Sequence, residues 1–393
     1  MTRSVIVAGA RTPIGRFRGA LASMRAVDLG AAAIVAALER SGVEPEQVEY
    51  TLMGHVLQAG QGQITARQAA IAAGIPQEIP AITINKVCPS GMAAIATADQ
   101  MIRAGELEIA VAGGMESMTN APFVLPKARE GARLGDTPML DSMIHDGLWC
   151  AFDDRHMGEG TDAINAELGI GREEQDVFAE RSHRLAAEAW DAGRFDDEVV
   201  SVDVPQRKGD AVSVARDEGI RPDTNLEGLA RLRPAFTEDG TITAGNASQI
   251  SDGACAVVVM SEEKAIQLGL APLATIEAYG MSAGRFPSLQ TVPAVAAERA
   301  LKRAGRAASE LGLLEINEAF AAVPVHSARM LDVDPEIVNV NGGAVALGHP
   351  IGASGARIVL TLALEMGRRE VDLGAAAICG GGGQGDALVL ARR

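Results

Sequence analysis

Residues 81–92 read AITINKVCPSGM and join a strand, a turn and the start of a helix. Residues 81–85 form a short run containing β-branched side chains, and Pro89 suits the first turn of the helix expected over 91–104. That helix leads to a second expected strand at 108–112 and to the turn Gly113-Gly114. Strands that alternate with alanine-rich helices in this way predict an α/β fold with a buried sheet.

The C-terminal third of the chain repeats this plan. Ser354-Gly355 opens an expected helix over 354–368, which leads to a strand at 375–378 and to a glycine run at 380–385. Two similar halves that face each other would bring Cys88 and His349 together. The other expected elements are strands at 4–7, 48–53, 274–279, 313–316, 337–340 and 387–391, and helices at 27–41, 293–304 and 319–330.

Between the two halves the sequence changes character. Residues 119–246 contain methionines, glycines and charges but few strand signals, and one amphipathic helix is expected over 173–192. A long insertion with little sheet is typical of a segment that covers a site or forms an interface.

Composition limits the partners and the location of the protein. The chain has 393 residues, 47% of them hydrophobic and 3% aromatic, with a net charge of −16. This acidity argues against nucleic acid or an anionic membrane as partner. The N-terminus has no signal-peptide pattern, and no apolar run has membrane-spanning length. Four cysteines at unrelated positions (88, 150, 255 and 379) indicate free thiols in a reducing compartment, so we expect a soluble cytoplasmic protein.

Cys88 and His349 are the first candidates for chemistry. A thiol at a helix N-terminus favours the thiolate and should have a lowered pKa, although a buried packing cysteine is the alternative. His349 lies in a tight turn between Gly348 and Pro350, where a plain turn histidine is the alternative. None of the 6 histidines has a Cys, Asp or Glu at zinc-ligand spacing, so no metal site is expected.

Cys379 precedes the glycine run at 380–385. A strand follows this run and no P-loop lysine is present, which argues against a phosphate-binding loop. The glycines instead suit a close approach of substrate and a backbone amide offered to an oxyanion. Asn317 lies at a strand-to-helix junction, where it either caps the helix or holds a water.

Together these residues resemble the four signature regions of the thiolases, in the same order. The motifs are Cys88 with Ser90-Gly91, Asn317-Glu318-Ala319-Phe320, Gly348-His349-Pro350 and Cys379-Gly380-Gly381-Gly382. The resemblance extends from residues 11–15 through 113–118, 233–236 and 243–248 to the last strand. It implies the thiolase fold, with two βαβαβαββ halves stacked as an α/β/α/β/α core. The implied N-terminal half comprises residues 1–118 with 250–270, and the implied C-terminal half comprises 271–393. An inserted loop domain at 119–249 would cover the CoA site.

The resemblance also implies the roles of the site residues. Cys88 would be the nucleophile that accepts an acyl group from a CoA thioester, with His349 as its activator. Cys379 would be the acid/base for the α-proton. His349 and a water held by Asn317 would stabilise the enolate oxygen, and the amides of Cys88 and Gly381 would bind the thioester oxyanion. The residues implied to contact the acyl group or CoA are His156, Met157, Arg221, Phe236, Ala247, Ser248, Ala319 and Phe320.

The implied activity is an acyltransferase that condenses two acetyl-CoA molecules to acetoacetyl-CoA and CoA, and the reverse thiolysis. A β-oxidation 3-ketoacyl-CoA thiolase with medium-chain preference is the alternative, and a non-catalytic CoA or lipid carrier is a further one. Another enzyme of the thiolase fold, a ketoacyl synthase or a hydroxymethylglutaryl-CoA synthase, is also an alternative. Those families lack the second cysteine in its glycine setting, so Cys379 argues against them. The implied substrates are CoA and acyl-CoA, with no required metal or redox cofactor, and the expected assembly is a homotetramer.

Two departures from the family pattern concern specificity. Residues 286–291 read FPSLQT where short-chain members carry Met-Gly-x-Gly-Pro. Phe286 either walls the acyl pocket or swings out to open it, and we expect the wall and short chains because His156-Met157 matches the short-chain pattern. His183 stands where a glutamine is expected, and its role is open.

Overall fold

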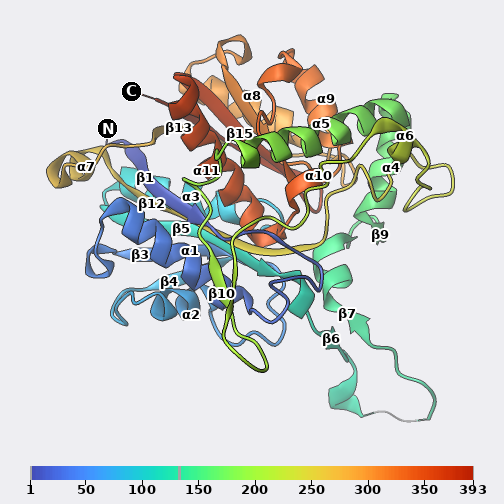
Figure 1. The fold of residues 1–393 in the computed structure, drawn as a ribbon, viewed down its shortest axis with the longest axis horizontal. Coiled ribbons are helices and arrows are strands. Elements are labelled where there is room, and N and C mark those ends of the chain that lie inside the picture. The colour runs from blue at the N-terminus through green and yellow to red at the C-terminus, as the bar shows by residue number, and fades with distance from the viewer. Residues whose placement is uncertain (1, 132–133, 393) are drawn as a thin grey trace.

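The structure is a computed structural model that describes residues 2–131 and 134–392 (Figure 1). Within these residues, ten strands form one sheet in the order β14-β15-β16-β13-β1-β12-β5-β3-β4, and β2 pairs with β12. The strands are β1 (Ser4–Arg11), β2 (Gly15–Arg16), β3 (Tyr50–Gly54), β4 (Ala81–Ile84), β5 (Ile109–Ser117), β12 (Ser251–Ser261), β13 (Ala274–Ala283), β14 (Leu313–Ile316), β15 (Leu373–Gly380) and β16 (Gln384–Ala391). The helices of the two halves are α1 (Ala26–Ser41), α2 (Thr65–Ala72), α3 (Ser90–Ala104), α7 (Glu262–Leu268), α8 (Val292–Ala304), α9 (Ala322–Leu331), α10 (Ala344–Leu347) and α11 (Ile351–Arg369).

The sheet is continuous only through a short junction between the halves. Ser4 to Ile6 of β1 pair with β13, whereas nearly the whole of β1 pairs with β12. Helices α3 and α11 pack between the halves, and α11 contacts β5 and β12 on one side and β14 and β15 on the other. Helix α1 covers the outer face of the first half and α8 that of the second. Three buried apolar clusters fill the spaces between these layers, which confirms the predicted layered α/β fold.

Small residues bring the two central helices into close contact. A Cβ atom on Gly91 of α3 would lie 2.8 Å from the backbone nitrogen of Ala356 in α11. A Cβ atom on Gly355 would lie 2.6 Å from the backbone nitrogen of Met92. Because only glycine allows such an approach, the N-termini of α3 and α11 meet at the centre of the molecule. The segments just before them carry Cys88 and His349, which therefore come together as predicted.

The segment between the halves contains more structure than expected. The predicted amphipathic helix is α5 (Arg172–Asp191), but α4 (Met157–Leu168) and α6 (Leu226–Ala230) are also present. Short ribbons complete it: β6 (Phe123–Val124) with β7 (Leu140–Asp141), β8 (Trp149–Cys150) with β9 (Arg155–His156), and β10 (Val202–Val204) with β11 (Val212–Val214). The arm that carries β6 and β7 extends away from the rest of the molecule (Figure 1).

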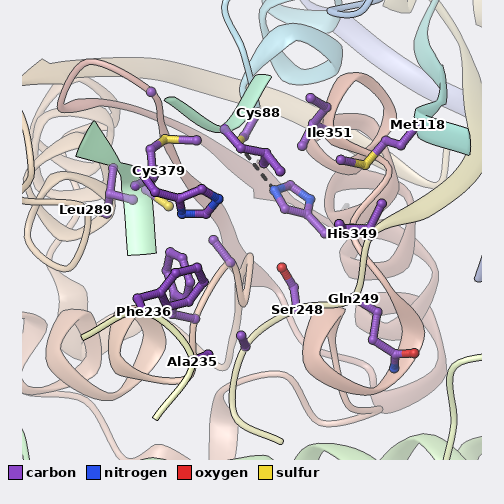
Figure 2. Close-up of a pocket in the computed structure, with 18 of the residues that line it drawn as sticks. Cys88, Met118, Ala235, Phe236, Ser248, Gln249, Leu289, His349, Ile351 and Cys379 are labelled. Carbon is purple, nitrogen blue, oxygen red and sulfur yellow. Dashed lines mark hydrogen bonds between the residues drawn. The ribbon is translucent and has the colours of Figure 1, made fainter. Parts of the chain in front are cut away.

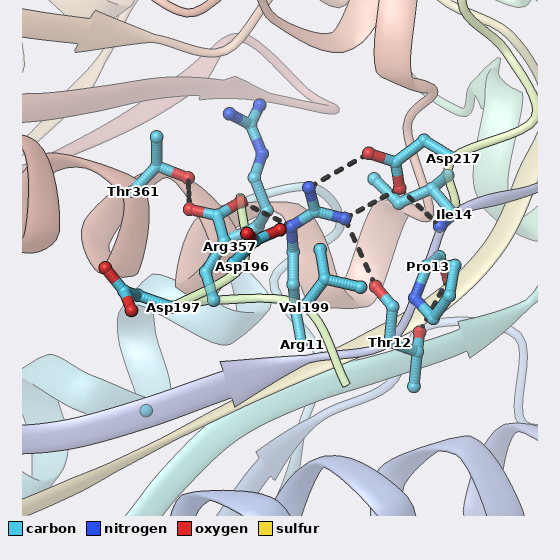
Figure 3. A network of polar contacts seen from close by, with 12 residues as sticks. Arg11, Thr12, Pro13, Ile14, Asp196, Asp197, Val199, Asp217, Arg357 and Thr361 are labelled. Atoms are coloured by element: carbon cyan, nitrogen blue, oxygen red, sulfur yellow. Dashed lines mark hydrogen bonds and ion pairs between the residues drawn. The ribbon is translucent and has the colours of Figure 1, made fainter. Parts of the chain in front are cut away.

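A buried arginine ties this segment to the core (Figure 3). Arg11 of β1 is 1% exposed, and its Nε lies 2.5 Å from Glu198 Oε1. Its Nη1 lies 2.7 Å from Asp217 Oδ1, which also accepts a hydrogen bond from the Ile14 backbone. Thr361 of α11 donates to the other oxygen of Glu198. Arg11 thus holds two buried carboxylates of this segment, and removing its guanidinium would leave both charges uncompensated.

The predicted strand at 337–340 is wrong. A short 3-10 helix occupies Pro335–Ile337, and Val338 makes only an isolated bridge to Leu314. Asn339 follows with φ of 48°, a left-handed conformation that interrupts an extended strand. Among the described residues, no helix combines the length and the apolar character needed to cross a membrane.

Candidate active site

Cys88 lies in a tightly held turn between β4 and α3. Val87, just before it, has φ of 54°, which is unusual for a β-branched residue. The Ser90 hydroxyl accepts the Lys86 amide at 2.8 Å, and the Asn85 side chain accepts the Val87 amide at 3.0 Å. These bonds hold a strained backbone, as is often found at functional sites.

The Cys88 thiol contacts the His349 imidazole (Figure 2). Its Sγ lies 3.3 Å from Nε2 of His349, and Nδ1 lies 2.6 Å from the Ser354 hydroxyl. The Ser354 hydroxyl donates to the Pro350 carbonyl at 3.0 Å, so we assign the ring proton to Nδ1. Nε2 is then free to accept the thiol proton of Cys88.

Burial controls the ionisation of this pair. It raises the pKa of Cys88 to about 12, although the Cys88 and Gly381 backbone amides act in the opposite direction. Burial, aided by the Arg357 charge, lowers the pKa of His349 to about 3. The predicted lowering of the Cys88 pKa is therefore wrong, because loss of hydration outweighs the amides. The resting pair is a neutral thiol and a neutral imidazole.

Two residues that the sequence did not single out position His349. Ser354 lies in the first turn of α11, and its hydroxyl bonds Nδ1 of His349. A hydroxyl in the helical turn that follows a candidate histidine is a sequence signal that could have identified this residue. The carbonyl of Gln249 accepts the His349 amide at 3.1 Å. The Gln249 side-chain amide lies 2.9 Å from the Gly219 carbonyl and also reaches the carbonyls of Val345 and Ala346. Nothing in the sequence pattern signals this role.

Asn317 lies beside the imidazole, directly after β14. Its Nδ2 is 3.4 Å from His349 Nε2, and its backbone amide donates to the Ala377 carbonyl. The helix-cap alternative is wrong, because the next helix begins only at Ala322. The buried Oδ1 of Asn317 has no hydrogen-bond partner among the described residues. A buried amide oxygen of this kind suits a bound water.

Cys379 is the last but one residue of β15, and a tight glycine turn follows it. Gly382 and Gly383 have φ of 72° and 68°, so the turn requires glycine. The turn directs the amide of Gly381 toward the Cys88 sulfur, where it stabilises negative charge. Burial, together with the nearby Cys88, raises the pKa of Cys379 well above its usual range. Both thiols are thus protonated at neutral pH.

These groups open into one apolar cavity of about 290 Å³ (Figure 2). The ring of His156 stacks on Phe236 at 4.7 Å, and Phe236 meets Phe320 edge-on at 6.0 Å. The predicted site residues that line the cavity are Cys88, His156, Met157, Phe236, Ala247, Ser248, Ala319, Phe320, His349, Cys379 and Gly381. Lining residues that were not predicted include Met118, Ile144, Leu148, Gln249, Leu289 and Ile351.

Arg221 does not line this cavity. It borders a separate surface hollow with Asp223, Thr224 and Asn225. Its backbone amide donates to Nδ1 of His183 at 3.1 Å. Burial lowers the pKa of His183 to about 4, so this histidine is a neutral acceptor that holds the Arg221 backbone in place.

The prediction that Phe286 walls the acyl pocket is wrong. Phe286 lies outside the cavity, stacked on Phe152 with ring centroids 4.6 Å apart. Leu289 lines the cavity instead and is 4% exposed.

A cysteine and histidine pair and a second cysteine, set where two α/β halves meet, define a thiol-based site of the thiolase class. The chain belongs to the thiolase family: residues 4–263 match the thiolase N-terminal domain and residues 270–392 match the thiolase C-terminal domain.

Named relatives cover the whole chain. The chain is 56% identical to the probable acetyl-CoA acetyltransferase of Mycolicibacterium smegmatis, over 99% of this chain and 100% of the relative. It is 52% identical to the acetyl-CoA acetyltransferase of Cupriavidus necator, over 100% of both. The crystal structure of the Bacillus anthracis acetyl-CoA acetyltransferase superposes with a TM-score of 0.97, at 42% identity and covering 100% of this chain and 99% of that one.

Proposed function

We propose that this thiolase transfers acetyl groups between CoA thioesters, condensing two acetyl-CoA molecules to acetoacetyl-CoA and CoA and catalysing the reverse thiolysis. The observation that carries the proposal is the 3.3 Å contact between Cys88 and His349 in a cavity that also holds Cys379. Relatives that match essentially the whole chain at 52–56% identity are named for this activity.

The first half-reaction forms an acetyl-enzyme. Cys88 passes its proton to Nε2 of His349 as its sulfur attacks the thioester carbonyl. The carbonyl oxygen becomes an oxyanion that accepts hydrogen bonds from the Cys88 and Gly381 amides. Its collapse breaks the bond to CoA, and the departing thiolate takes the proton of Cys379. The products are acetyl-Cys88, an imidazolium and a Cys379 thiolate, so charge and protons balance.

The second half-reaction forms the carbon–carbon bond. The Cys379 thiolate removes an α-proton from a second acetyl-CoA, and the resulting enolate oxygen is stabilised by the His349 imidazolium and a water on Asn317. The enolate carbon attacks the acetyl carbonyl and expels the Cys88 thiolate, which regains its proton from His349. The raised pKa of Cys379 suits this step, because its thiolate is then a strong base for the α-proton.

The cavity supports a short acyl chain. Its lining is mostly apolar and would shield the acetyl-enzyme from water. Leu289 and Met157 occupy its wall, leaving about 290 Å³ for the acyl group and the reacting end of CoA. A medium-chain preference is the competing proposal, and it requires Leu289 to give way.

The proposal also covers the setting of the enzyme. Coenzyme A thioesters are its substrates, and the chemistry uses thiols and an imidazole without a metal or redox step. All four cysteines are free, which suits a reducing, cytoplasmic compartment. The exposed side chains of Phe123, Leu125 and Met139 on the extended arm favour assembly into a homotetramer. Light scattering on a variant with these three replaced by Ser tests the assembly.

The activity is tested with purified protein, acetoacetyl-CoA and CoA. Thiolysis should yield two acetyl-CoA per acetoacetyl-CoA consumed, and 3-ketooctanoyl-CoA should be turned over more slowly. Cys88→Ala is the control for background hydrolysis. Absence of thiolysis would contradict the proposed activity. Faster turnover of the longer substrate would contradict the proposed short-chain preference.

A further inference from the structure

An ion pair between a half-buried lysine and a buried aspartate joins the nucleophile turn to the hairpin that carries the second cysteine. Nζ of Lys86 lies 2.6 Å from Oδ1 of Asp386, and the Tyr279 hydroxyl donates to Oδ2 at 2.6 Å. The Asp386 side chain is 0% exposed and that of Lys86 is 19% exposed. The three side chains come from both halves of the molecule: Lys86 follows β4, whereas Tyr279 and Asp386 lie on β13 and β16.

Both ends of this cluster lie next to reacting groups. Lys86 precedes Cys88 by two positions, at the start of the turn that contains the strained Val87. Asp386 pairs in register with Ile378, the neighbour of Cys379. The ion pair therefore connects the backbone of one thiol to the strand pair of the other, across the boundary between the halves.

The fit between the two segments is tight. A Cβ atom on Gly380 would lie 2.5 Å from Cδ of Pro89 and 3.4 Å from the Lys86 carbonyl. The amide of the next residue, Gly381, acts on the Cys88 thiol and opposes the rise of its pKa. A small separation of the turn from the hairpin would withdraw that amide and move the two thiols apart.

Stability alone is a weak reason for such a pair. Burial raises the pKa of Asp386, and Lys86 and Tyr279 only oppose this effect. Buried ion pairs are often no more stabilising than apolar side chains of similar size, but they do fix one arrangement. The position of the pair beside the strained turn indicates that the arrangement is what matters.

We propose that Lys86, Asp386 and Tyr279 are positioning residues that hold the Cys88 turn against the Cys379 hairpin and so set the distance from the Cys88 sulfur to the Gly381 amide. This inference rests on the proposed thiolase activity, because it assigns the cluster a role in that reaction. None of the three side chains lines the cavity, so they act through the backbone.

The test compares kcat and KM for thiolysis in Lys86→Met and in the double variant Lys86→Met/Asp386→Asn. Misplacement of reacting groups by about 1 Å costs on the order of a hundredfold in rate, so kcat should fall about tenfold to a hundredfold. KM for CoA should change less than about threefold, because the CoA-contacting groups are untouched. The double variant removes the lone buried charge and should recover thermal stability without recovering kcat. Lys86→Arg, which keeps the ion pair, should retain most of the rate.

Arg103→Met is the matched control. Arg103 forms an ion pair with the buried Asp99 at 2.7 Å, near the C-terminal end of α3 and away from the cavity. It should lose stability while keeping kcat. A double variant that recovers kcat together with stability, or an Arg103→Met variant that loses as much kcat as Lys86→Met, would overturn the proposal.

The same experiment separates this inference from the proposed function. Thiolysis by the wild-type protein decides the function, and the variant-to-wild-type ratio decides the positioning role. The rate at which iodoacetamide modifies Cys88 can be compared between variant and wild type without CoA. The Gly381 amide stabilises the Cys88 thiolate in this reaction as well, so its withdrawal would slow the modification. Modification at least about threefold slower in Lys86→Met supports the inference, and an unchanged rate contradicts it, whatever the acyltransferase assay shows.

Discussion

The Sγ atom of Cys88 lies 3.3 Å from Nε2 of His349, although 261 residues separate the two in the sequence. Burial raises the pKa of the thiol to about 12 and lowers that of the imidazole to about 3. The two groups are therefore both neutral between these values. In the proposed mechanism, proton transfer between them is therefore coupled to attack on the substrate rather than completed beforehand.

This ionisation state predicts how the thiol reacts in the absence of substrate. Only the thiolate is alkylated, and its fraction rises tenfold per pH unit below the pKa. The rate of Cys88 alkylation by iodoacetamide should thus climb about tenfold per unit from pH 7 to 10. Cys88→Ala supplies the background rate of the other cysteines. A plateau reached below pH 8 would show that Cys88 and His349 form a thiolate–imidazolium pair instead.

Ser354 is predicted to orient the catalytic imidazole. Its hydroxyl lies 2.6 Å from Nδ1 of His349, and Ser354→Ala leaves that nitrogen without this partner. Misplacement of a reacting group by about 1 Å costs on the order of a hundredfold in rate, so kcat for thiolysis should fall by about 10- to 100-fold. Ser41→Ala removes a buried hydroxyl bonded to the Leu38 carbonyl in α1 and should leave kcat unchanged. Equal activities of the two variants would remove Ser354 from the account.

Leu289, rather than Phe286, is predicted to limit acyl-chain length. Leu289→Ala enlarges the cavity, and each methylene that it admits contributes about 0.8 kcal/mol, or roughly fourfold. The ratio of kcat/KM for 3-ketohexanoyl-CoA to that for acetoacetyl-CoA should therefore rise up to about fifteenfold. Phe286→Ala is the control, because that ring stacks on Phe152 outside the cavity. A larger change in the Phe286 variant than in the Leu289 variant would reverse the assignment.

His183 makes stability depend on acid pH. Burial lowers its pKa to about 4, from 6.5, so between these values the unfolded chain binds a proton that the folded chain does not. Stability therefore falls as the pH falls from 6.5 to 4, by about 1.4 kcal/mol per unit. His183→Gln keeps an acceptor for the Arg221 amide without titrating. From pH 7 to 5, the free energy of unfolding measured in urea should drop by about 2 kcal/mol less in this variant than in the wild type. Equal drops in the two proteins would contradict the role of His183.

Three site residues that lie in or next to glycine-containing segments could be identified from the sequence, because sharp turns have few structural alternatives. Cys88, His349 and Cys379 stand at junctions where a backbone must bend sharply, and their order along the chain matched a family pattern. Ser354 and Gln249 were missed because they act through hydrogen bonds to His349 that only the folded arrangement creates. The ionisation of Cys88 was mispredicted for a related reason: a helix N-terminus can be inferred from sequence, but the depth of burial cannot.

Segments without strong periodicity were the least predictable. Helix α4 was not expected, since Met157–Leu168 contains two glycines and is capped by the His156 side chain rather than by a usual capping residue. The strand expected at 337–340 failed at Asn339, whose left-handed backbone follows from its hydrogen bonds with Ile316 and Glu318. In both cases tertiary contacts override the local preference.

The most direct test of the account is to map the acetyl group after incubation with acetyl-CoA. Mass spectrometry of the wild type and of Cys379→Ser should find the label on the peptide containing Cys88, while the variant loses most condensation and thiolysis. This outcome would place the acetyl group on Cys88 and make Cys379 essential for the carbon–carbon step but not for acyl transfer, since the CoA thiolate can leave without the Cys379 proton. A label on Cys150 or Cys255, or full turnover by Cys88→Ala, would contradict the account.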